Sequence, residues 1–222
     1  MLTSVRDAAT RRLIELAVEK LGPGPARFAF LAVGKHGREE LTFSGDQESA
    51  LVYGNDAGEG AGEYFVELGR LVTDWLLACG YPLGMGSAMA KNPRWCQPLS
   101  VWETYFTDWI REARPEQVAE ACAFIDFRMV FGEAALADAL RSHVHEETRR
   151  HPAFLALLAA NARLFAPPAH LPGEGTAGLT EVGTGVLDTR EALSPIVGFA
   201  RLYALRHGLA PAHTLDRLDA IA

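Results

Sequence analysis

The chain has 222 residues, of which 49% are hydrophobic and 22% are charged, which is enough for one large folded domain or two small ones and excludes global disorder. The formal net charge is -7, and the chain has no basic patch of the kind that nucleic-acid-binding proteins use. No run of residues is long and apolar enough to cross a membrane. The three cysteines, Cys79, Cys96 and Cys122, form no C-x-x-C pair, so we expect reduced thiols in a cytoplasmic protein rather than disulfides or a zinc site.

The N-terminal quarter of the chain predicts one helix and two strands. Apolar residues recur at helical spacing over residues 4–21, and the Gly-Pro-Gly-Pro run that follows ends this helix. Residues 27–33 (RFAFLAV) favour a strand and end at a glycine, which is typical of a buried strand. Residues 35–42 predict a turn or a short helix, residues 47–53 predict a second strand, and the glycine-rich residues 55–62 predict a loop.

The next part of the chain is predicted to be mostly helical. Apolar spacing and flanking prolines indicate three helices, at residues 63–79, 98–113 and 133–150. Residues 81–89 contain one proline and two glycines and predict a short strand with a loop. The run at residues 121–131 (ACAFIDFRMVF) is apolar apart from Asp126 and Arg128, and we interpret it as a central strand.

The character of the sequence changes near residue 150. Residues 151–222 contain no convincing strand, and helices fit three segments, at residues 152–166, 191–207 and 211–221. We therefore predict an α+β fold with two domains: a mixed sheet flanked by helices in residues 1–150, and an all-helical domain in residues 151–222. Because the chain ends within an apolar helix, we expect either a homodimer or a longer polypeptide.

Two acids stand one residue apart at the start of the second predicted strand. Successive side chains of a strand point to opposite faces, so Asp46 and Glu48 share a face. Carboxylates placed in this way repel one another unless a cation lies between them, and a hard divalent cation such as Mg²⁺ takes carboxylate oxygens as ligands. The alternative is that both acids cap a turn at a solvated strand start.

The segment before these acids is suited to hold phosphate. Gly34 ends a strand and opens a turn, whose exposed backbone N–H groups can hold a phosphate group. Lys35 and Arg38 add positive charge there. Lys35 could instead be an ordinary surface lysine, and Arg38 could simply brace the loop through Glu40.

A third carboxylate is expected from the run at residues 121–131. Asp126 is its single acid, and a buried carboxylate needs a cationic partner or a metal. Together with Asp46 and Glu48 it could hold one or two metal ions. The alternative is a structural ion pair between Asp126 and Arg128.

These motifs resemble a known family. G-x-x-G-R-x-E followed by D-Q-E is similar to the signature of the DNA polymerase beta-like nucleotidyltransferases, in the family found beside CBS and cyclic-nucleotide-binding domains. The first motif falls on Gly34, Gly37, Arg38, Glu40, Asp46, Gln47 and Glu48. Residues 125–141 resemble the strand of the third carboxylate and the helix after it, residues 89–95 (MAKNPRW) a middle motif, and residues 193–218 the helical substrate-binding domain.

The resemblance implies an enzyme that moves a nucleoside monophosphate from a nucleoside triphosphate to an acceptor hydroxyl, with proteins among the candidate acceptors and a signalling role. It implies Mg²⁺ or Mn²⁺ as cofactor and a nucleotide in a cleft between the two domains. The residues it makes catalytic and metal-binding are Asp46, Glu48 and Asp126. Those it makes nucleotide-binding are Gly34, Lys35, Gly37 and Arg38.

Three positions depart from the family pattern. Lys35 stands where the family has serine, Gly45 where it has serine or threonine, and Glu48 where it has a second aspartate. Lysine can still hold phosphate as a point charge, and glutamate can still bind Mg²⁺ through a longer arm. These departures motivate two alternatives, a regulatory module that binds a nucleotide without turnover, and an interaction scaffold that binds none.

Overall fold

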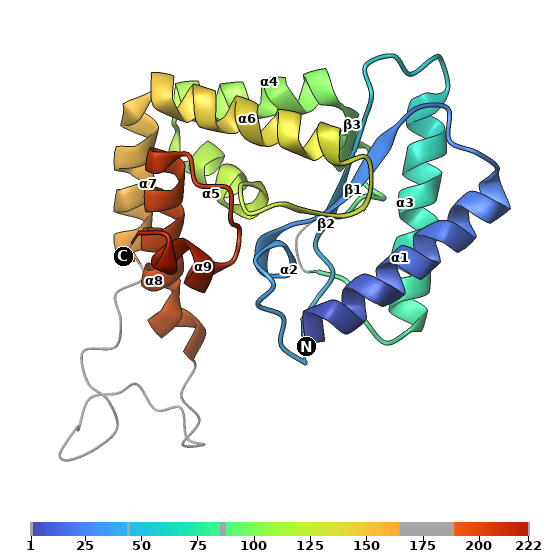
Figure 1. The fold of residues 1–222 in the computed structure, drawn as a ribbon, viewed down its shortest axis with the longest axis horizontal. Coiled ribbons are helices and arrows are strands. Elements are labelled where there is room, and N and C mark those ends of the chain that lie inside the picture. Colours follow the sequence, from blue (N-terminus) through green and yellow to red (C-terminus); the bar gives the residue numbers. More distant parts are fainter. Residues whose placement is uncertain (1, 44, 85–87, 165–188, 222) are drawn as a thin grey trace.

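A four-stranded mixed sheet organises the first part of the chain, in the computed structural model that describes residues 2–43, 45–84, 88–164 and 189–221 (Figure 1). The strands are β1 (Phe28–Ala32), β2 (Ser49–Tyr53), β3 (Cys96–Pro98) and β4 (Arg128–Gly132). Their order in the sheet is β3-β2-β1-β4. β1 is antiparallel to both β2 and β4, while β2 and β3 are parallel. The mixed sheet of the predicted α+β fold is confirmed.

Helices make up most of the remaining described residues. They are α1 (Leu2–Leu21), α2 (Gly34–Gly37), α3 (Ala61–Ala78), α4 (Leu99–Glu112), α5 (Pro115–Phe124), α6 (Ala134–Arg150), α7 (Pro152–Leu164), α8 (Thr189–His207) and α9 (Thr214–Asp219). The helices predicted from apolar spacing on both sides of residue 150 are therefore confirmed, with ends that shift by a few residues. None of the described helices is long and apolar enough to cross a membrane.

Both faces of the sheet are covered, because alternate side chains of each strand enter different cores. Leu31 and Val52 belong to the core that α4, α5 and α6 build, whereas Phe30 and Leu51 belong to the core beneath α1 and α3. All five residues of β2 are buried. A strand buried on both faces has an unbroken apolar sequence, which explains why β1 and β2 were visible as apolar runs.

The prediction of a central strand at residues 121–131 is wrong. α5 occupies the first part of this run, the chain bends at Ile125 and Asp126, and β4 begins only at Arg128, at the edge of the sheet. Pro115 opens α5. The buried residues of this helix lie at helical intervals, at Val118, Ala121 and Phe124. The end of α5 that lies in this run, residues 121–124 (ACAF), is apolar at every position, so its helical period was hidden in the sequence.

Two short elements differ from prediction because they carry little periodicity. β3 has three residues and was not predicted, and a 3-10 helix, Pro93–Trp95, precedes it. Of the strand expected at residues 81–89, residues 85–87 lie outside the described residues, and the described part forms an isolated bridge between Gln47 and Leu83. This bridge nevertheless holds the segment after α3 alongside the chain that enters β2.

Among the C-terminal helices, α7 packs on α5 and α6, α8 packs on α6 and α7, and α9 packs on α8 (Figure 1). Phe154 and Leu158 of α7 and Leu205 of α8 belong to the same core as Phe127 and Leu140. The helical character predicted for this region is confirmed. The polar connection predicted at residues 167–188 lies outside the described residues, and the division into domains at residue 150 stays a prediction.

Candidate functional site

Two glycines shape a tight turn directly after β1. Gly34 has a φ of +57°, a left-handed conformation that favours glycine. A Cβ added at Gly37 would lie 1.8 Å from the carbonyl oxygen of Asp126 and 3.0 Å from that of Ala32. The turn that forms α2 is therefore pressed against the backbone at Asp126, and only glycine fits at residue 37.

We expect Gly37→Ala to lower the free energy of unfolding by about 1–3 kcal/mol, because the added methyl overlaps backbone that cannot rotate away. Gly58→Ala is the matched control, since a Cβ at residue 58 meets no atom within 4 Å. Urea denaturation followed by circular dichroism compares the two variants with the wild type. Equal midpoints for the two variants would contradict the close approach of the turn to Asp126.

The chain that enters β2 places Asp46 and Glu48 on one side. Between them, the buried amide of Gln47 donates hydrogen bonds to the carbonyl oxygens of Thr73 (3.1 Å) and Tyr81 (2.9 Å). Because Gln47 points into the protein, its two neighbours in this extended segment point the other way. Both acids are partly buried.

The carboxylate of Glu48 lies over Gly34. A Cβ on Gly34 would come within 2.3 Å of Glu48 Oε2, so the missing side chain at residue 34 makes the room that this carboxylate fills. Burial raises the pKa of Glu48, and the charge of Asp46 raises it further. The charge and the backbone N–H of Lys35 oppose this rise. The structure thus brings Gly34, Lys35, Asp46 and Glu48 together.

Arg6 of α1 joins this group, although no sequence motif singled it out. Its guanidinium is 3% exposed, donates from Nη1 to the carbonyl oxygen of Gly45 (3.0 Å) and lies over the ring of Tyr81 at 4.8 Å. Burial lowers the pKa of Arg6, and the charges of Asp46 and Glu48 are among those that oppose the shift. Its Nε has no hydrogen-bond partner among the described residues. Arg6 therefore supplies positive charge to the acid pair from the inner side.

A second set of contacts ties α1 to the turn. His36 Nε2 lies 2.7 Å from Asp7 Oδ1, and both side chains are buried. Arg128 of β4 contacts the same carboxylate at 2.9 Å and also pairs with Glu39 at 3.0 Å. Burial lowers the pKa of His36, while its hydrogen bond to Asp7 opposes the shift. These contacts hold the turn in place from the side of the N-terminal helix.

Asp126 does not join Asp46 and Glu48, which corrects the expectation of three converging carboxylates. It is completely buried, at 0% exposed, and its oxygens are taken by arginines. Oδ2 accepts hydrogen bonds from Arg38 Nη1 (2.9 Å) and Arg201 Nη2 (2.6 Å), and Oδ1 accepts one from Arg217 Nη1 (2.8 Å). Burial alone would raise the pKa of Asp126, but these arginines hold it well below its usual range.

Across the described ranges, no group of three His, Cys, Asp or Glu side chains is placed to hold a metal ion. In this arrangement the carboxylate of Asp126 is occupied by its arginine partners and is not grouped with Asp46 and Glu48. The alternative of an ion pair with Arg128 is also wrong, since Arg128 contacts Asp7 and Glu39. The partners of Asp126 come from distant segments of the chain instead.

The two cationic residues of the turn have different surroundings. Arg38 is 9% exposed, and besides Asp126 it contacts Glu40, with Nε 2.8 Å from Oε2. This is the bracing contact that the sequence left open, although the charge of Arg38 still helps to lower the pKa of Glu48. Lys35 is exposed at the turn, so its ammonium group can reach a ligand that approaches the two acids.

Two family models match the chain. One, described as "Putative nucleotidyltransferase DUF294", matches residues 1–116. The other, described as "Putative nucleotidyltransferase substrate binding domain", matches residues 152–222. A search of curated proteins found no match. The first match contains α1, the turn and both acids, and the second contains α7, α8 and α9.

Proposed function

The chain belongs to the family of putative nucleotidyltransferases DUF294, and on that premise we propose that it transfers a nucleoside monophosphate from a nucleoside triphosphate to an acceptor hydroxyl. The observation that carries this proposal is the acid pair beside the glycine turn. Asp46 and Glu48 lie on one side of the chain, next to Lys35 and Gly34. Acids that bind metal beside a cation that binds phosphate are the combination that such a reaction requires.

Asp46 and Glu48 are the residues that would hold Mg²⁺ or Mn²⁺. Their chemistry fits the ion, because both side chains offer hard carboxylate oxygens. Burial, together with the charge of Asp46, raises the pKa of Glu48. When bound, a divalent cation would neutralise charge on the phosphates and on the leaving pyrophosphate. With two protein carboxylates, the remaining ligands of the ion would be water and phosphate oxygens, as is common for Mg²⁺.

The turn and its surroundings would bind the triphosphate. Lys35 is exposed and close enough to Glu48 to influence its pKa, so its ammonium group would contact phosphate oxygens at the same place. Gly34 and Gly37 give the turn its shape, while Arg38 and Arg6 would add positive potential from buried positions. Most of the rate would then come from positioning and charge neutralisation.

The acceptor would bind on the side of the C-terminal helices, because the family match over residues 152–222 is described as a substrate-binding domain. We propose a protein hydroxyl as one acceptor and a signalling role for the transfer, in the cytoplasm. The three free cysteines of the described residues are consistent with that location. A homodimer also stays a prediction, which light scattering coupled to gel filtration would test.

Incubation with labelled ATP, UTP, CTP or GTP, together with Mg²⁺ or Mn²⁺ and cell extract, tests the reaction. We expect one nucleotide to leave its label on an acceptor, and we expect Asp46→Ala to reduce the transfer by about 100-fold or more, because charge stabilisation at the phosphates is lost. Absence of labelling with every nucleotide, or full activity of Asp46→Ala, would exclude the proposed reaction.

A second candidate is a regulatory module that binds a nucleotide without turnover. The contact of Glu48 with Gly34 favours it, because a glutamate in place of the family's aspartate carries the carboxylate further over the turn. Isothermal calorimetry separates the two functions. Binding of a nucleotide that is recovered unchanged after incubation with cell extract supports the module, and labelled product supports the transferase.

A further inference from the structure

Asp126 joins three segments that lie far apart in the sequence. Arg38 belongs to the turn at residues 34–40, Arg201 to α8 and Arg217 to α9. All three donate hydrogen bonds to the carboxylate of Asp126. We call these four residues the Asp126 cluster. Arg217 is 3% exposed and also donates from Nε to the carbonyl oxygen of Pro211 (2.8 Å). The Asp126 cluster is thus a buried contact between the two regions that match the family models, residues 1–116 and 152–222. Asp126 itself lies in the sequence between these two regions.

A neighbouring acid makes the same kind of bridge. Glu40 accepts from Arg38 Nε at Oε2 and from the backbone N–H of Thr214 at Oε1, at 2.8 Å and 3.2 Å. Thr214 is the first residue of α9. Two acids therefore connect the turn with α9, and Arg38 takes part in both connections.

The backbone of Asp126 completes the connection. Its carbonyl oxygen lies against Gly37 so closely that no side chain fits there, while its carboxylate holds α8 and α9. A displacement of the C-terminal helices would therefore act on the same residue that packs against the turn. Close-packed backbone transmits such a displacement because it has little room to absorb it.

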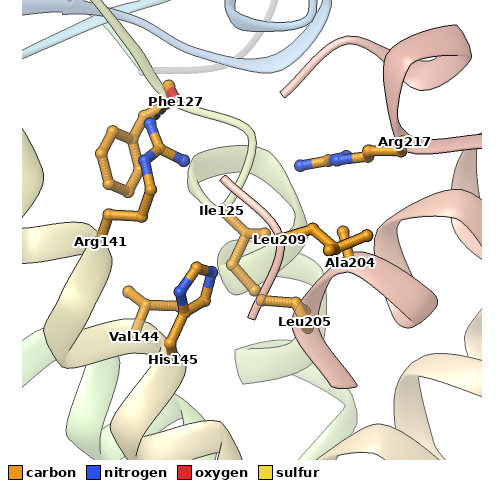
Figure 2. A pocket seen from close by; sticks show the side chains of 9 residues that line it. All are labelled: Ile125, Phe127, Arg141, Val144, His145, Ala204, Leu205, Leu209 and Arg217. Atoms are coloured by element: carbon orange, nitrogen blue, oxygen red, sulfur yellow. Dashed lines mark hydrogen bonds between the residues drawn. The ribbon is translucent and has the colours of Figure 1, made fainter. Parts of the chain in front are cut away.

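Asp126 is the acid that pairs with Arg217 of α9, and the cationic Arg141 lies among the other neighbours of Arg217. Figure 2 shows a cavity lined by Arg217, by Arg141 and His145 of α6, and by apolar side chains. Burial lowers the pKa of Arg141 and of His145, and the charge of Arg217 lowers both further. The cavity has a volume of about 10 Å³, room for about one water molecule. Arg217 therefore borders a small void and is held by its hydrogen bonds to Asp126 and to the carbonyl oxygen of Pro211.

We infer that Asp126 is a positioning residue, through which docked α8 and α9 hold the turn at residues 34–40 in the geometry seen here. Arg201 and Arg217 fix the carboxylate, and Asp126 in turn fixes Gly37 by its backbone and Arg38 by its side chain. When the helices leave, Asp126 loses its contacts with Arg201 and Arg217, and Glu40 loses its contact with the backbone N–H of Thr214. The turn therefore keeps this conformation only while α8 and α9 are docked.

The consequence for ligand binding rests on the proposed function. A triphosphate held at Lys35 and an acceptor held by the C-terminal helices would influence one another's affinity, since both would bias the same contact. Such linkage is reciprocal by thermodynamic necessity. Binding of the acceptor would then favour the turn that binds the nucleotide.

Hydrogen exchange of the full chain, followed by mass spectrometry, tests the coupling without any ligand. The backbone N–H groups of Gly37, Arg38 and Glu40 donate to carbonyl oxygens within the turn, so their exchange reports its opening. In Arg217→Gln we expect exchange of the peptide covering residues 34–40 to accelerate by about fivefold or more, the lower range of allosteric coupling. Arg217→Lys keeps the charge and should give a smaller acceleration, and it carries the test if Arg217→Gln does not fold.

Two controls separate coupling from general destabilisation. Arg206→Gln removes an exposed arginine of α8 and should leave the turn unchanged. Leu158→Ala removes a buried side chain of α7 outside the Asp126 cluster and lowers global stability. It should accelerate exchange in the C-terminal helices more than in the turn.

Two results would overturn the inference. One is faster exchange in α9 of the Arg217 variants with an unchanged turn. The other is equal acceleration of the turn in Leu158→Ala and Arg217→Gln at the same measured stability, since that would indicate global opening. Calorimetry with ATP and Mg²⁺ adds the functional arm, in which we expect affinity to fall by about fivefold or more in Arg217→Gln and by less in Arg217→Lys. A wild type that binds no nucleotide would contradict the proposed function, and the exchange result would still decide the coupling.

Discussion

Asp126→Asn should lower the free energy of unfolding by about 3–5 kcal/mol at neutral pH, the cost of breaking a buried ion pair from one side. The side chain keeps its size, so no cavity forms, but three guanidinium groups lose their shared counter-charge. An asparagine also offers one acceptor oxygen where the carboxylate offers two. The change is therefore larger than that expected for an ordinary surface contact, and urea denaturation measures it directly.

The effect of Asp126→Asn should shrink in acid. The arginines depress the folded-state pKa of Asp126 below its value in the unfolded chain, so its contribution to stability is fully present above the unfolded pKa. Below about pH 4 the unfolded chain takes up a proton at this residue while the folded protein does not, and the contribution declines. Stability curves of the wild type and Asp126→Asn should therefore converge as the pH falls.

Asp74→Asn is the control for Asp126→Asn. Asp74 pairs with Arg70 on the exposed side of α3, where water screens the interaction, so the substitution should change stability little at any pH. A loss of stability in Asp126→Asn that matches this control would contradict the role of the buried carboxylate. A large loss that stays constant down to acid pH would assign the effect to the lost acceptor oxygen rather than to charge.

The sequence predicted the parts of this site that are local. Gly34, Lys35, Asp46 and Glu48 come from a stretch of fifteen residues, where a turn and an extended segment determine which side chains meet. The alternation of side chains was enough to place the two acids on one side. The glycines could be predicted for the same reason, since a tight turn demands them whatever surrounds it.

The surroundings of Asp126 could not be predicted, because they depend on tertiary packing. Its three arginines come from residues 38, 201 and 217, and no spacing in the sequence relates these positions. The strand predicted at residues 121–131 was wrong because the end of α5, residues 121–124, is apolar at every position and hides the helical period. A lone acid in an apolar run correctly indicated a buried charge in need of partners, and the error lay in choosing a metal over arginine.

Arg6 shows a second limit of the sequence. It lies on α1 among other polar residues, where an arginine is usually exposed. Only the packing of α1 against the segment around Gly45 brings its guanidinium beside the two acids. A charged residue that meets a site from a separate helix leaves no local pattern, so such contacts emerge only from the structure.

Glu48→Gln should stabilise the protein in metal-free buffer while reducing the proposed transfer by about 100-fold or more. Burial and the charge of Asp46 raise the folded-state pKa of Glu48, so its ionised form costs stability at neutral pH. This cost is present above the folded-state pKa and disappears as the pH falls below the unfolded one. A gain of about 1 kcal/mol, which is the order of one screened charge pair, would raise the Tm by about 2–4 °C for a chain of this length.

Mg²⁺ should make the wild type more stable than Glu48→Gln, the reverse of the order expected in metal-free buffer. Mg²⁺ that binds only the folded state stabilises the wild type by an amount that rises with the logarithm of its concentration above the Kd, and Glu48→Gln lacks a carboxylate with which to bind it. Calorimetric scans with EDTA and with Mg²⁺ give both comparisons, with Glu59→Gln, in the exposed loop before α3, as the matched control. Glu48→Asp keeps the carboxylate and should keep the response to the ion. If Glu48→Gln is less stable than the wild type in EDTA, ionised Glu48 does not destabilise the protein. If Mg²⁺ still raises the Tm of Glu48→Gln, Glu48 is not a ligand of the ion.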